Sequence, residues 1–188
     1  DRVIPMLPTR LSNDLCSLNP NEEKLVIACI MELDQDGNLI ESRIEEGIIK
    51  TTKRLSYEKS NDVLVNGLVN YPDYECAIES LKLMVLLKDK LNQKRRSRGS
   101  IDFDTIDPKI ILNDLGEAID IIAIDRGESE RVIEEFMILA NETVASFITQ
   151  MDLPFIYRVH DKPDNIKFQT LKGFVGNLGY KILSSHPK

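Results

Sequence analysis

Residues 128 to 150 read ESERVIEEFMILANETVASFITQ, and this stretch carries the strongest structural signal in the chain. Its apolar residues recur every three or four positions, which is the spacing of an amphipathic helix. The pattern therefore predicts one long helix over 128–150. We expect its buried face to carry Val132, Ile133, Phe136, Met137, Ala140, Val144, Phe147 and Ile148.

Polar residues of the same helix form a second pattern. Glu134 and Asn141 are seven residues apart, or two helical turns, so their side chains share one face. Arg126 lies eight residues before Glu134, near the helix start. A carboxylate and an amide aligned on one face can hydrogen-bond a polar ligand. Taken alone, the spacing favours a plainer interpretation, in which Glu134 and Glu135 simply face solvent.

Outward from this helix, the remaining sequence alternates between β-rich runs and helical periodicity. Loops rich in Asp, Asn and Gly at 34–38 and 114–116 predict hairpin turns. Three prolines limit the first twenty residues to an irregular path with one short turn. The predicted strands are 24–33, 39–51, 100–104, 109–113, 117–125 and 155–160, and the further predicted helices are 57–67, 73–97 and 164–178. The fold class is α+β, with antiparallel strands and hairpins packed with two or three long helices.

The predicted helix at 73–97 combines an apolar face with a basic end. The apolar face carries Ile78, Leu81, Val85 and Leu86. Near the end of the helix, six cations fall within eleven residues, and we call them the basic run: Lys88, Lys90, Lys94, Arg95, Arg96 and Arg98. The run is either a solvated helix end whose cations complement the helix dipole, or an electrostatic guide for a phosphate backbone.

Composition limits the class of protein. The chain has 188 residues, enough for one domain with a substantial core, and its 42% apolar and 29% charged residues are ordinary for a globular protein. No apolar run approaches the roughly 18 residues of a membrane helix, so we expect no membrane partner. Three widely spaced cysteines suggest neither a zinc site nor a disulfide framework, which fits a reducing cytoplasm. The formal net charge of −7 argues weakly against a nucleic-acid partner, with the basic run as a local exception.

Six short segments are more specific in combination than any of them alone. They are IPMLP at 4–8, LSNDLCSL at 11–18, RLSY at 54–57, GSIDF at 99–103, IEEFMILAN at 133–141 and YRVHDKP at 157–163. In this order they resemble the catalytic domain of the bacterial RNase II/RNase R family of 3′-to-5′ exoribonucleases. The resemblance identifies residues 1–188 as the middle portion of a single, incomplete RNB-type catalytic domain.

The resemblance implies processive hydrolysis of single-stranded RNA from its 3′ end, with release of nucleoside 5′-monophosphates. The strand would thread through a channel towards magnesium held by aspartates, where two metals would activate a water and stabilise the leaving oxygen. Cold-shock-like and S1-like domains would deliver the strand. The expected partner is therefore single-stranded RNA, and Mg²⁺ is the expected cofactor of the full-length, cytoplasmic parent.

Candidate RNA-binding residues follow from the motif positions. The resemblance gives Phe103 the role of stacking on bases near the RNA 3′ end, which suits an enzyme that accepts every sequence. It gives Tyr57 and Glu134 the role of contacting the sugar near the scissile end, where a carboxylate can accept a hydrogen bond from a 2′-hydroxyl. Arg126 and Asn141 are further candidates because they accompany Glu134 along the helix. The plainer alternatives are a core position for Phe103, a sheet-edge cap for Tyr57 and a solvated position for Glu134.

The start of the 128–150 helix departs from the family pattern. Where relatives often carry Ala-His ahead of the Ile-Glu-Glu segment, this chain has Ser129-Glu130, which changes the local charge. His160 lies beside Arg158 in an apolar predicted strand and is assigned a structural position.

The metal-binding residues are a larger departure. The resemblance places the catalytic aspartates before Asp1, and the chain begins with neither an initiator Met nor a signal peptide. Five acidic residues within the chain do not reproduce that cluster: Asp34, Asp36, Asp102, Asp104 and Asp107. We therefore assign no catalytic or metal-binding residue here, and expect the chain alone to bind no catalytic metal and to be inactive. The alternatives are a non-catalytic RNA-binding module that has lost the aspartates, and an interaction protein with an acidic surface.

Overall fold

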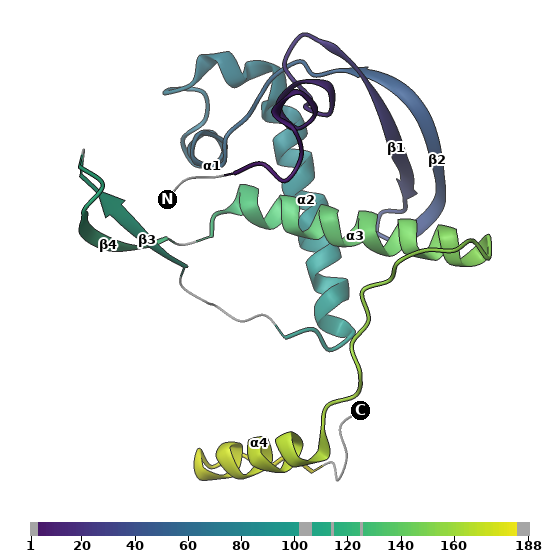
Figure 1. The fold of residues 1–188 in the computed structure, drawn as a ribbon, viewed down its shortest axis with the longest axis vertical. Coiled ribbons are helices and arrows are strands. Elements are labelled where there is room, and N and C mark those ends of the chain that lie inside the picture. The colour runs from purple at the N-terminus through teal and green to yellow at the C-terminus, as the bar shows by residue number, and fades with distance from the viewer. Residues whose placement is uncertain (1–3, 102–106, 114, 125, 184–188) are drawn as a thin grey trace. The chain divides into compact units, whose positions relative to one another are not determined.

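The structure, a computed structural model, describes residues 4–101, 107–113, 115–124 and 126–183. Helices and antiparallel strand pairs make up the chain, which confirms the predicted α+β class (Figure 1). The strands are β1 (Glu23–Leu33), β2 (Leu39–Lys50), β3 (Asp107–Leu112) and β4 (Ala118–Ile124). The helices are α1 (Tyr57–Asn66), α2 (Glu75–Ser97), α3 (Glu128–Gln150) and α4 (Asn165–Asn177), with short helical turns at Leu11–Leu15 and Pro72–Tyr74. The chain divides into two compact units, Asp1–Phe147 and Ile148–Lys188, which are described separately.

The first hairpin, β1–β2, is closed by local chemistry in its loop. One carboxylate oxygen of Asp34 accepts hydrogen bonds from the backbone N–H groups of Asp36, at 2.9 Å, and Asn38, at 2.8 Å. The side-chain amide of Asn38 donates to the other oxygen at 2.7 Å, and these hydrogen bonds lower the pKa of Asp34. Gly37 completes the turn with a φ of 75°, which other residues rarely adopt. The strands and loop predicted over 24–51 are therefore confirmed.

The second hairpin, β3–β4, repeats this device. The side-chain oxygen of Asn113 accepts hydrogen bonds from the backbone N–H groups of Leu115, at 3.0 Å, and Glu117, at 2.9 Å. The two predicted strands on either side of this loop pair antiparallel, as expected. The strand predicted at 100–104 is not formed at Ser100 or Ile101, and its remaining residues lie outside the described part of the chain.

A small apolar core lies among α1, α2 and α3. Its buried apolar side chains, between 1% and 7% exposed, are Val63, Tyr74, Leu81, Leu91 and Val132. Helix α1 ends at Gly67, which has a φ of 70°, as the sequence predicts. Helix α2 begins at Glu75, two residues later than predicted, because Pro72–Tyr74 first forms a 3₁₀ turn. The predicted apolar face of α2 is wrong at Leu86, which is 62% exposed, while Leu91 is buried in its place.

The buried face of α3 differs from its prediction in an informative way. Ile133 and Met137 are 41% and 59% exposed, although their spacing predicted burial. Glu135 and Thr143 are instead buried, at 3% and 4% exposed. The prediction that Glu135 faces solvent is therefore wrong. The physical reason is a buried partner for its charge, Arg95 of α2.

The unit Ile148–Lys188 contains α4 and the segment before it. The carboxylate of Asp164 caps α4 by accepting the backbone N–H of Ile166 at 2.6 Å, and the helix ends near Gly179, whose φ is 86°. The strand predicted at 155–160 is wrong, because no described strand lies beside it to form a ladder. Phe155 and Tyr157 instead stack edge to face, with ring centroids 5.3 Å apart.

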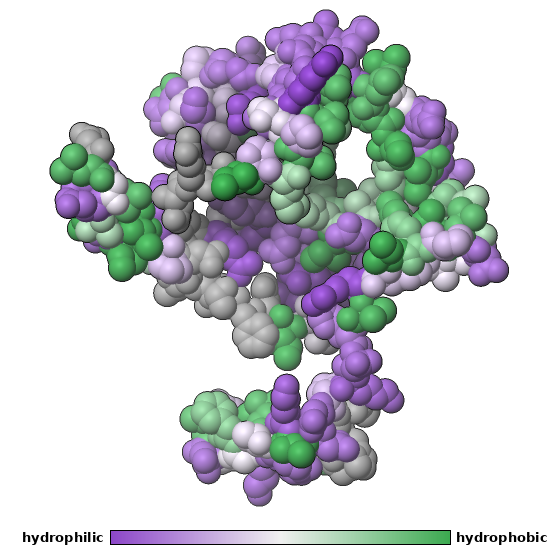
Figure 2. Space-filling model, in the orientation of Figure 1, coloured by the Kyte–Doolittle hydropathy of each residue, from purple (hydrophilic) through white to green (hydrophobic). Residues whose placement is uncertain are grey.

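Apolar side chains also remain on the surface of both hairpins (Figure 2). Leu25 and Ile27 of β1 are 83% and 77% exposed, and Ile110 and Ile121 of the second hairpin are 56% and 67% exposed. Among the described helices, none has the length and apolarity needed to cross a membrane.

Candidate functional site

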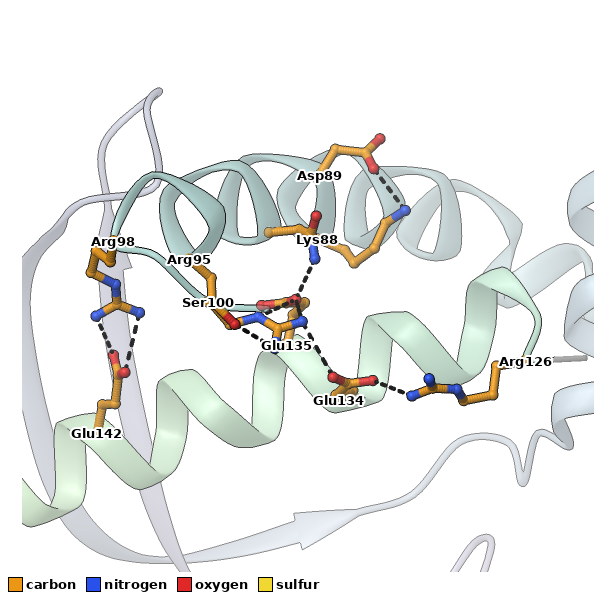
Figure 3. A network of polar contacts seen from close by, with 10 residues as sticks. Lys88, Asp89, Arg95, Arg98, Ser100, Arg126, Glu134, Glu135 and Glu142 are labelled. Carbon is orange, nitrogen blue, oxygen red and sulfur yellow. Dashed lines mark hydrogen bonds and ion pairs between the residues drawn. The ribbon is translucent and has the colours of Figure 1, made fainter. Parts of the chain in front are cut away.

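A polar cavity of about 280 Å³ lies where side chains of α2 and α3 meet. Side chains from Lys88 to Arg98 contact glutamates of α3 in the same order along both segments. Figure 3 shows these contacts for Arg95 and Arg98. Two of the candidate RNA-binding residues, Arg126 and Glu134, lie in its wall. The full lining is Lys88, Asp89, Asn92, Arg95, Arg96, Arg126, Glu128, Arg131, Glu134 and Glu135.

The centre of this cavity is a buried ion pair between Arg95 and Glu135. The Arg95 Nη2 and Nε atoms lie 2.8 and 3.0 Å from the same carboxylate oxygen of Glu135. The side chains are only 18% and 4% exposed. The amide of Asn92 donates a further hydrogen bond to that oxygen at 2.8 Å. A buried carboxylate needs such partners, because removing an unpaired charge from water is costly.

Glu134, which precedes Glu135 in the sequence, is held less tightly and stays accessible. Arg95 Nη2 lies 3.3 Å from one of its oxygens, and Arg126 Nη1 lies 3.4 Å from the other. Its side chain is 35% exposed, against 4% for Glu135. Figure 3 shows Glu134 between the two guanidinium groups. The arrangement joins Glu134 and Arg126, which the sequence placed near one helix face, and leaves the carboxylate with room to accept another donor.

Lys88 makes a second link between the two helices. Its ammonium lies 2.6 Å from Glu128 and 2.7 Å from Asp89, and its side chain is 8% exposed. Burial lowers the pKa of Lys88, but the hydrogen bonds to Asp89 and Glu128 outweigh burial and raise it overall.

Other members of the basic run also bond within the protein. Lys94 donates to the backbone carbonyl of Gly37 in the first hairpin loop at 2.8 Å. Arg98 lies 3.2 Å from Glu142, in a pair whose side chains are 57% and 53% exposed. The interpretation of the run as a solvated helix end is therefore wrong for Lys88, which is buried, while the interpretation as a phosphate guide stays a prediction.

The start of α3 is capped from another helix. The Asn61 carbonyl oxygen, on α1, accepts the backbone N–H of Ser129 at 2.9 Å and the Ser129 hydroxyl at 2.8 Å. The Asn61 amide donates to Glu130 at 2.9 Å. Gly127, just before α3, has no side chain to act as a cap, and a Cβ atom there would collide with the Asn61 amide. The Ser129-Glu130 departure from the family pattern thus belongs to an inter-helix cap.

Glu130 is ionised more readily in this setting. Burial raises its pKa, but hydrogen bonds from Asn61, from its own backbone N–H and from Ser129 together lower it below its ordinary value. A lowered pKa means that the contribution of Glu130 to stability is present at neutral pH. That contribution is lost as the pH falls through the lowered pKa.

Replacing Asn61 by alanine should lower the free energy of unfolding by about 1 kcal/mol, the usual cost of a lost helix cap. Gly127→Ala should also destabilise, because its Cβ collides with Asn61. The double variant should cost less than the sum of the two, since the alanine at 61 removes the collision. Amide hydrogen exchange in α3 measures these changes. Asn66→Ala is the matched control, because the Asn66 amide hydrogen-bonds Asp62 within α1 and does not contact α3 in the described structure. If the losses of stability in Asn61→Ala and Gly127→Ala simply add in the double variant, the two effects do not both arise at the Asn61 side chain.

Comparison with known proteins assigns the fold. The RNB domain family model matches residues 1–186. The chain belongs to the RNB domain family. It is 43% identical over 182 residues to Ribonuclease R 1 of Lactococcus lactis, covering 97% of this chain and 22% of the relative. It is 40% identical over 187 residues to Ribonuclease R of Thermotoga maritima, covering 99% of this chain and 26% of the relative. The chain therefore spans about a quarter of the length of these relatives.

Solved structures give the same assignment. RNase R of Mycoplasma genitalium in complex with ribose methylated single-stranded RNA matches with a TM-score of 0.88 and 33% identity, over 98% of this chain and 30% of that chain. Yeast Ssd1, a pseudonuclease, matches with a TM-score of 0.67 and 20% identity, over 96% of this chain and 22% of that chain. At that identity the second match supports the RNB fold alone.

Two further candidates of this RNB domain, Tyr57 and Asn141, do not line the polar cavity. Tyr57 is the first residue of α1, 49% exposed, so its interpretation as a sheet-edge cap is wrong. It lines a separate, largely apolar cavity of about 530 Å³ that also includes Val132 and Ile133 of α3. Asn141 is exposed on α3 and does not line the polar cavity. Phe103 lies outside the described residues.

Sequence reasoning missed the residues that organise the site. The sequence places Arg95 only within the basic run, predicts a solvent-facing Glu135 and assigns no role to Asn61. A usable signal was present, because α2 ends in cations while α3 begins with acids. Opposite charges on two long helices of one small domain are expected to pair.

The carboxylates of this cavity do not form a magnesium site. Glu128, Glu134 and Glu135 are each paired with a lysine or arginine. Within residues 4–101, 107–113, 115–124 and 126–183, no three His, Cys, Asp or Glu side chains are grouped to hold a metal ion. Magnesium requires several oxygen ligands that are free to bind it. The described donor set therefore does not fit the metal that the family implies.

Proposed function

We propose that this chain is the middle portion of the catalytic domain of a processive 3′-to-5′ exoribonuclease, which degrades single-stranded RNA to nucleoside 5′-monophosphates. The observation that carries this proposal is the match, over nearly the whole chain, to an RNase R in complex with ribose methylated single-stranded RNA. The identities of about 40% to ribonucleases R from two distant bacteria support it. This portion supplies part of the RNA channel and residues that read the sugar.

In this proposal Glu134 reads the ribose near the scissile end. An ionised carboxylate only accepts hydrogen bonds, so it favours a sugar that carries a 2′-hydroxyl donor and gains nothing from a deoxyribose. The partial exposure of Glu134 and the free acceptor capacity left beside Arg95 and Arg126 support this role. Tyr57 contacts the sugar from α1, Phe103 stacks on the bases, and Asn141 provides a further polar contact along α3.

The hydrolytic step itself belongs to residues outside this chain. The glutamates of the polar cavity are engaged by cations, so we assign Mg²⁺ to acidic groups elsewhere in the full-length parent. The parent binds single-stranded RNA, requires no membrane and acts in the cytoplasm. This chain binds and orients the strand.

A second candidate is a non-catalytic RNA-binding relative. The RNB fold is shared by a pseudonuclease, so the fold alone is compatible with loss of catalysis. Nuclease activity of the full-length parent decides between the two. Release of nucleoside 5′-monophosphates from the 3′ end supports the exoribonuclease, whereas RNA binding without release supports the binding module.

Glu134→Gln in the full-length parent should narrow the discrimination between RNA and deoxy-substituted RNA by about three- to tenfold. The reason is that the amide oxygen of Gln can still accept a hydrogen bond, but without the charge that makes such a bond roughly twice as strong. The measurement is kcat/KM on an RNA oligonucleotide and on the same strand with one 2′-deoxy sugar near its 3′ end. Glu142→Gln, two turns later on α3, is the matched control. An unchanged ratio in the Glu134 variant would refute the ribose-reading role.

A further inference from the structure

We infer that Arg95 is a positioning residue for Glu134, which holds this carboxylate in the orientation that meets the ribose of a bound RNA strand. The inference rests on the proposed function, in which Glu134 accepts a hydrogen bond from a 2′-hydroxyl. Arg95 itself touches no RNA in this scheme. It acts through the two adjacent carboxylates of α3.

Arg95 has a firm anchor in the protein. Its Nη2 and Nε atoms both contact one oxygen of Glu135, and that oxygen also accepts the amide of Asn92. On its other side, Nη1 lies 3.4 Å from the hydroxyl of Ser100. Glu135 and Ser100 hold the guanidinium group from two sides through all three of its nitrogen atoms, so these contacts fix its plane. A planar fork fixed in this way can orient a second carboxylate.

From this anchor Arg95 reaches Glu134. The same Nη2 atom that contacts Glu135 lies 3.3 Å from Glu134. The two glutamates are neighbours in sequence but differ in environment, because Glu135 is 4% exposed and Glu134 is 35% exposed. Glu135 therefore serves as the buried anchor, and Glu134 as the group presented outward. Figure 3 shows this division, with Arg95 between the two carboxylates.

Arg126 approaches the other oxygen of Glu134, at 3.4 Å. Two guanidinium groups on opposite oxygens restrict rotation of the carboxylate about its terminal bond. A carboxylate offers about four acceptor sites, so these contacts leave room for a hydroxyl donor. A reader already held in position loses less conformational freedom when RNA binds.

Lysine cannot replace arginine in this role. An ammonium group is a point charge without a fixed plane, so it can neutralise Glu135 without orienting Glu134. Arg95→Lys therefore separates the positioning role from simple charge pairing. Arg98 supplies the matched control, because it lies three residues after Arg95, just past the end of α2, and pairs with Glu142 on α3. That pair is largely exposed and contacts neither Glu134 nor Glu135 in the described structure.

The test uses the full-length parent with Arg95→Lys, Arg95→Gln, Glu134→Gln and Arg98→Lys. For each variant, kcat/KM is measured on an RNA oligonucleotide and on the same strand with one 2′-deoxy sugar near its 3′ end. Arg95→Lys should narrow the RNA-to-deoxy ratio by about three- to tenfold, since a small misplacement of a site group is costly. Arg98→Lys should leave the ratio unchanged. The double variant Arg95→Lys/Glu134→Gln should narrow it no further than Glu134→Gln alone.

The outcomes separate this inference from the proposed function. If Glu134→Gln narrows the ratio and the Arg95 variants do not, the inference is overturned and the proposed function stands. If Glu134→Gln leaves the ratio unchanged, the ribose-reading role fails and the inference fails with it. A purely structural Arg95 would lower the rates on both substrates equally, which also overturns the inference. Should Arg95→Gln fail to fold, Arg95→Lys and the double variant give the same decision.

Discussion

Arg95→Ala is expected to lower the free energy of unfolding by about 3–5 kcal/mol, which is the usual cost of leaving one partner of a buried ion pair without the other. The residue left behind is Glu135, 4% exposed, with only the amide of Asn92 among its described hydrogen-bond donors. Glu135→Ala should cost less, because the remaining Arg95 is 18% exposed and keeps its contacts to Glu134 and Ser100. The prediction therefore includes that Arg95→Ala lowers the free energy of unfolding by more than Glu135→Ala does.

Amide hydrogen exchange in α2 and α3 is the suitable measurement, since it reports the opening of this unit within a longer protein. Arg98→Ala is the control and should change stability by less than about 1 kcal/mol, because exposed ion pairs contribute little. The Arg98 side chain is 57% exposed. Equal, small losses for Arg95→Ala and Arg98→Ala would contradict a buried, structurally important pair.

Replacing both partners should restore much of the lost stability. In Arg95→Met/Glu135→Leu no charge remains to be buried, and apolar side chains of similar length can fill the space. We expect this double variant to lie closer to the wild type than Arg95→Ala does. It should nevertheless lose the discrimination between RNA and deoxy-substituted RNA, because Glu134 is no longer positioned. We therefore expect this double variant to recover folding stability without recovering the discrimination between RNA and deoxy-substituted RNA.

Much of the fold could be predicted because its determinants are local. Both hairpin loops contain an Asp or Asn whose side chain accepts the backbone N–H groups of the next few residues. Helix α1 stops at Gly67, and α4 begins after the capping carboxylate of Asp164. Each of these features depends on residues within about five positions, so the sequence contains the whole interaction.

The errors have non-local causes. The segment 155–160 has strand-like residues, but a strand also needs a neighbour, and none pairs with it in the described chain. Glu135 looked solvent-facing because its buried partner, Arg95, is 40 residues away on another helix. The cap of α3 comes from Asn61, 68 residues before Ser129. Helical periodicity gives the faces of a helix, but not which face buries a charge.

The same reasoning applies to the site. A motif position indicates Glu134 and helical spacing indicates Arg126, and the structure places their side chains 3.4 Å apart at one cavity. These patterns do not indicate Arg95 or Glu135, because those residues act on Glu134 rather than on a ligand. A sequence motif identifies the residue that would contact the substrate. The residues that hold it are found only from three-dimensional contacts.

The chain alone, residues 1–188, should release no nucleotides from RNA. Metal-assisted hydrolysis needs a group of oxygen ligands that can hold the ion and orient a water. In the described residues no such group is assembled, and Glu128, Glu134 and Glu135 are engaged by Lys88, Arg95 and Arg126. Freeing these acids for a metal would break the buried pair that joins α2 to α3.

The assay incubates the chain, at high concentration, with Mg²⁺ and a single-stranded oligoribonucleotide. The strand is labelled at its 5′ end, so that shortening from its 3′ end can be followed. The far-UV circular dichroism spectrum of the chain is recorded first, so that activity is measured on protein that contains the expected helices. The full-length parent is the positive control and should shorten the strand from its 3′ end. Shortening by the chain alone that is lost in Glu134→Gln would show that catalytic ligands lie within these residues. Shortening that is unchanged in Glu134→Gln and in Arg95→Gln, and absent from a mock preparation without the chain, would also contradict the prediction, because it would place the catalytic ligands elsewhere within these residues. Shortening that the mock preparation shows as well would come from a contaminating nuclease.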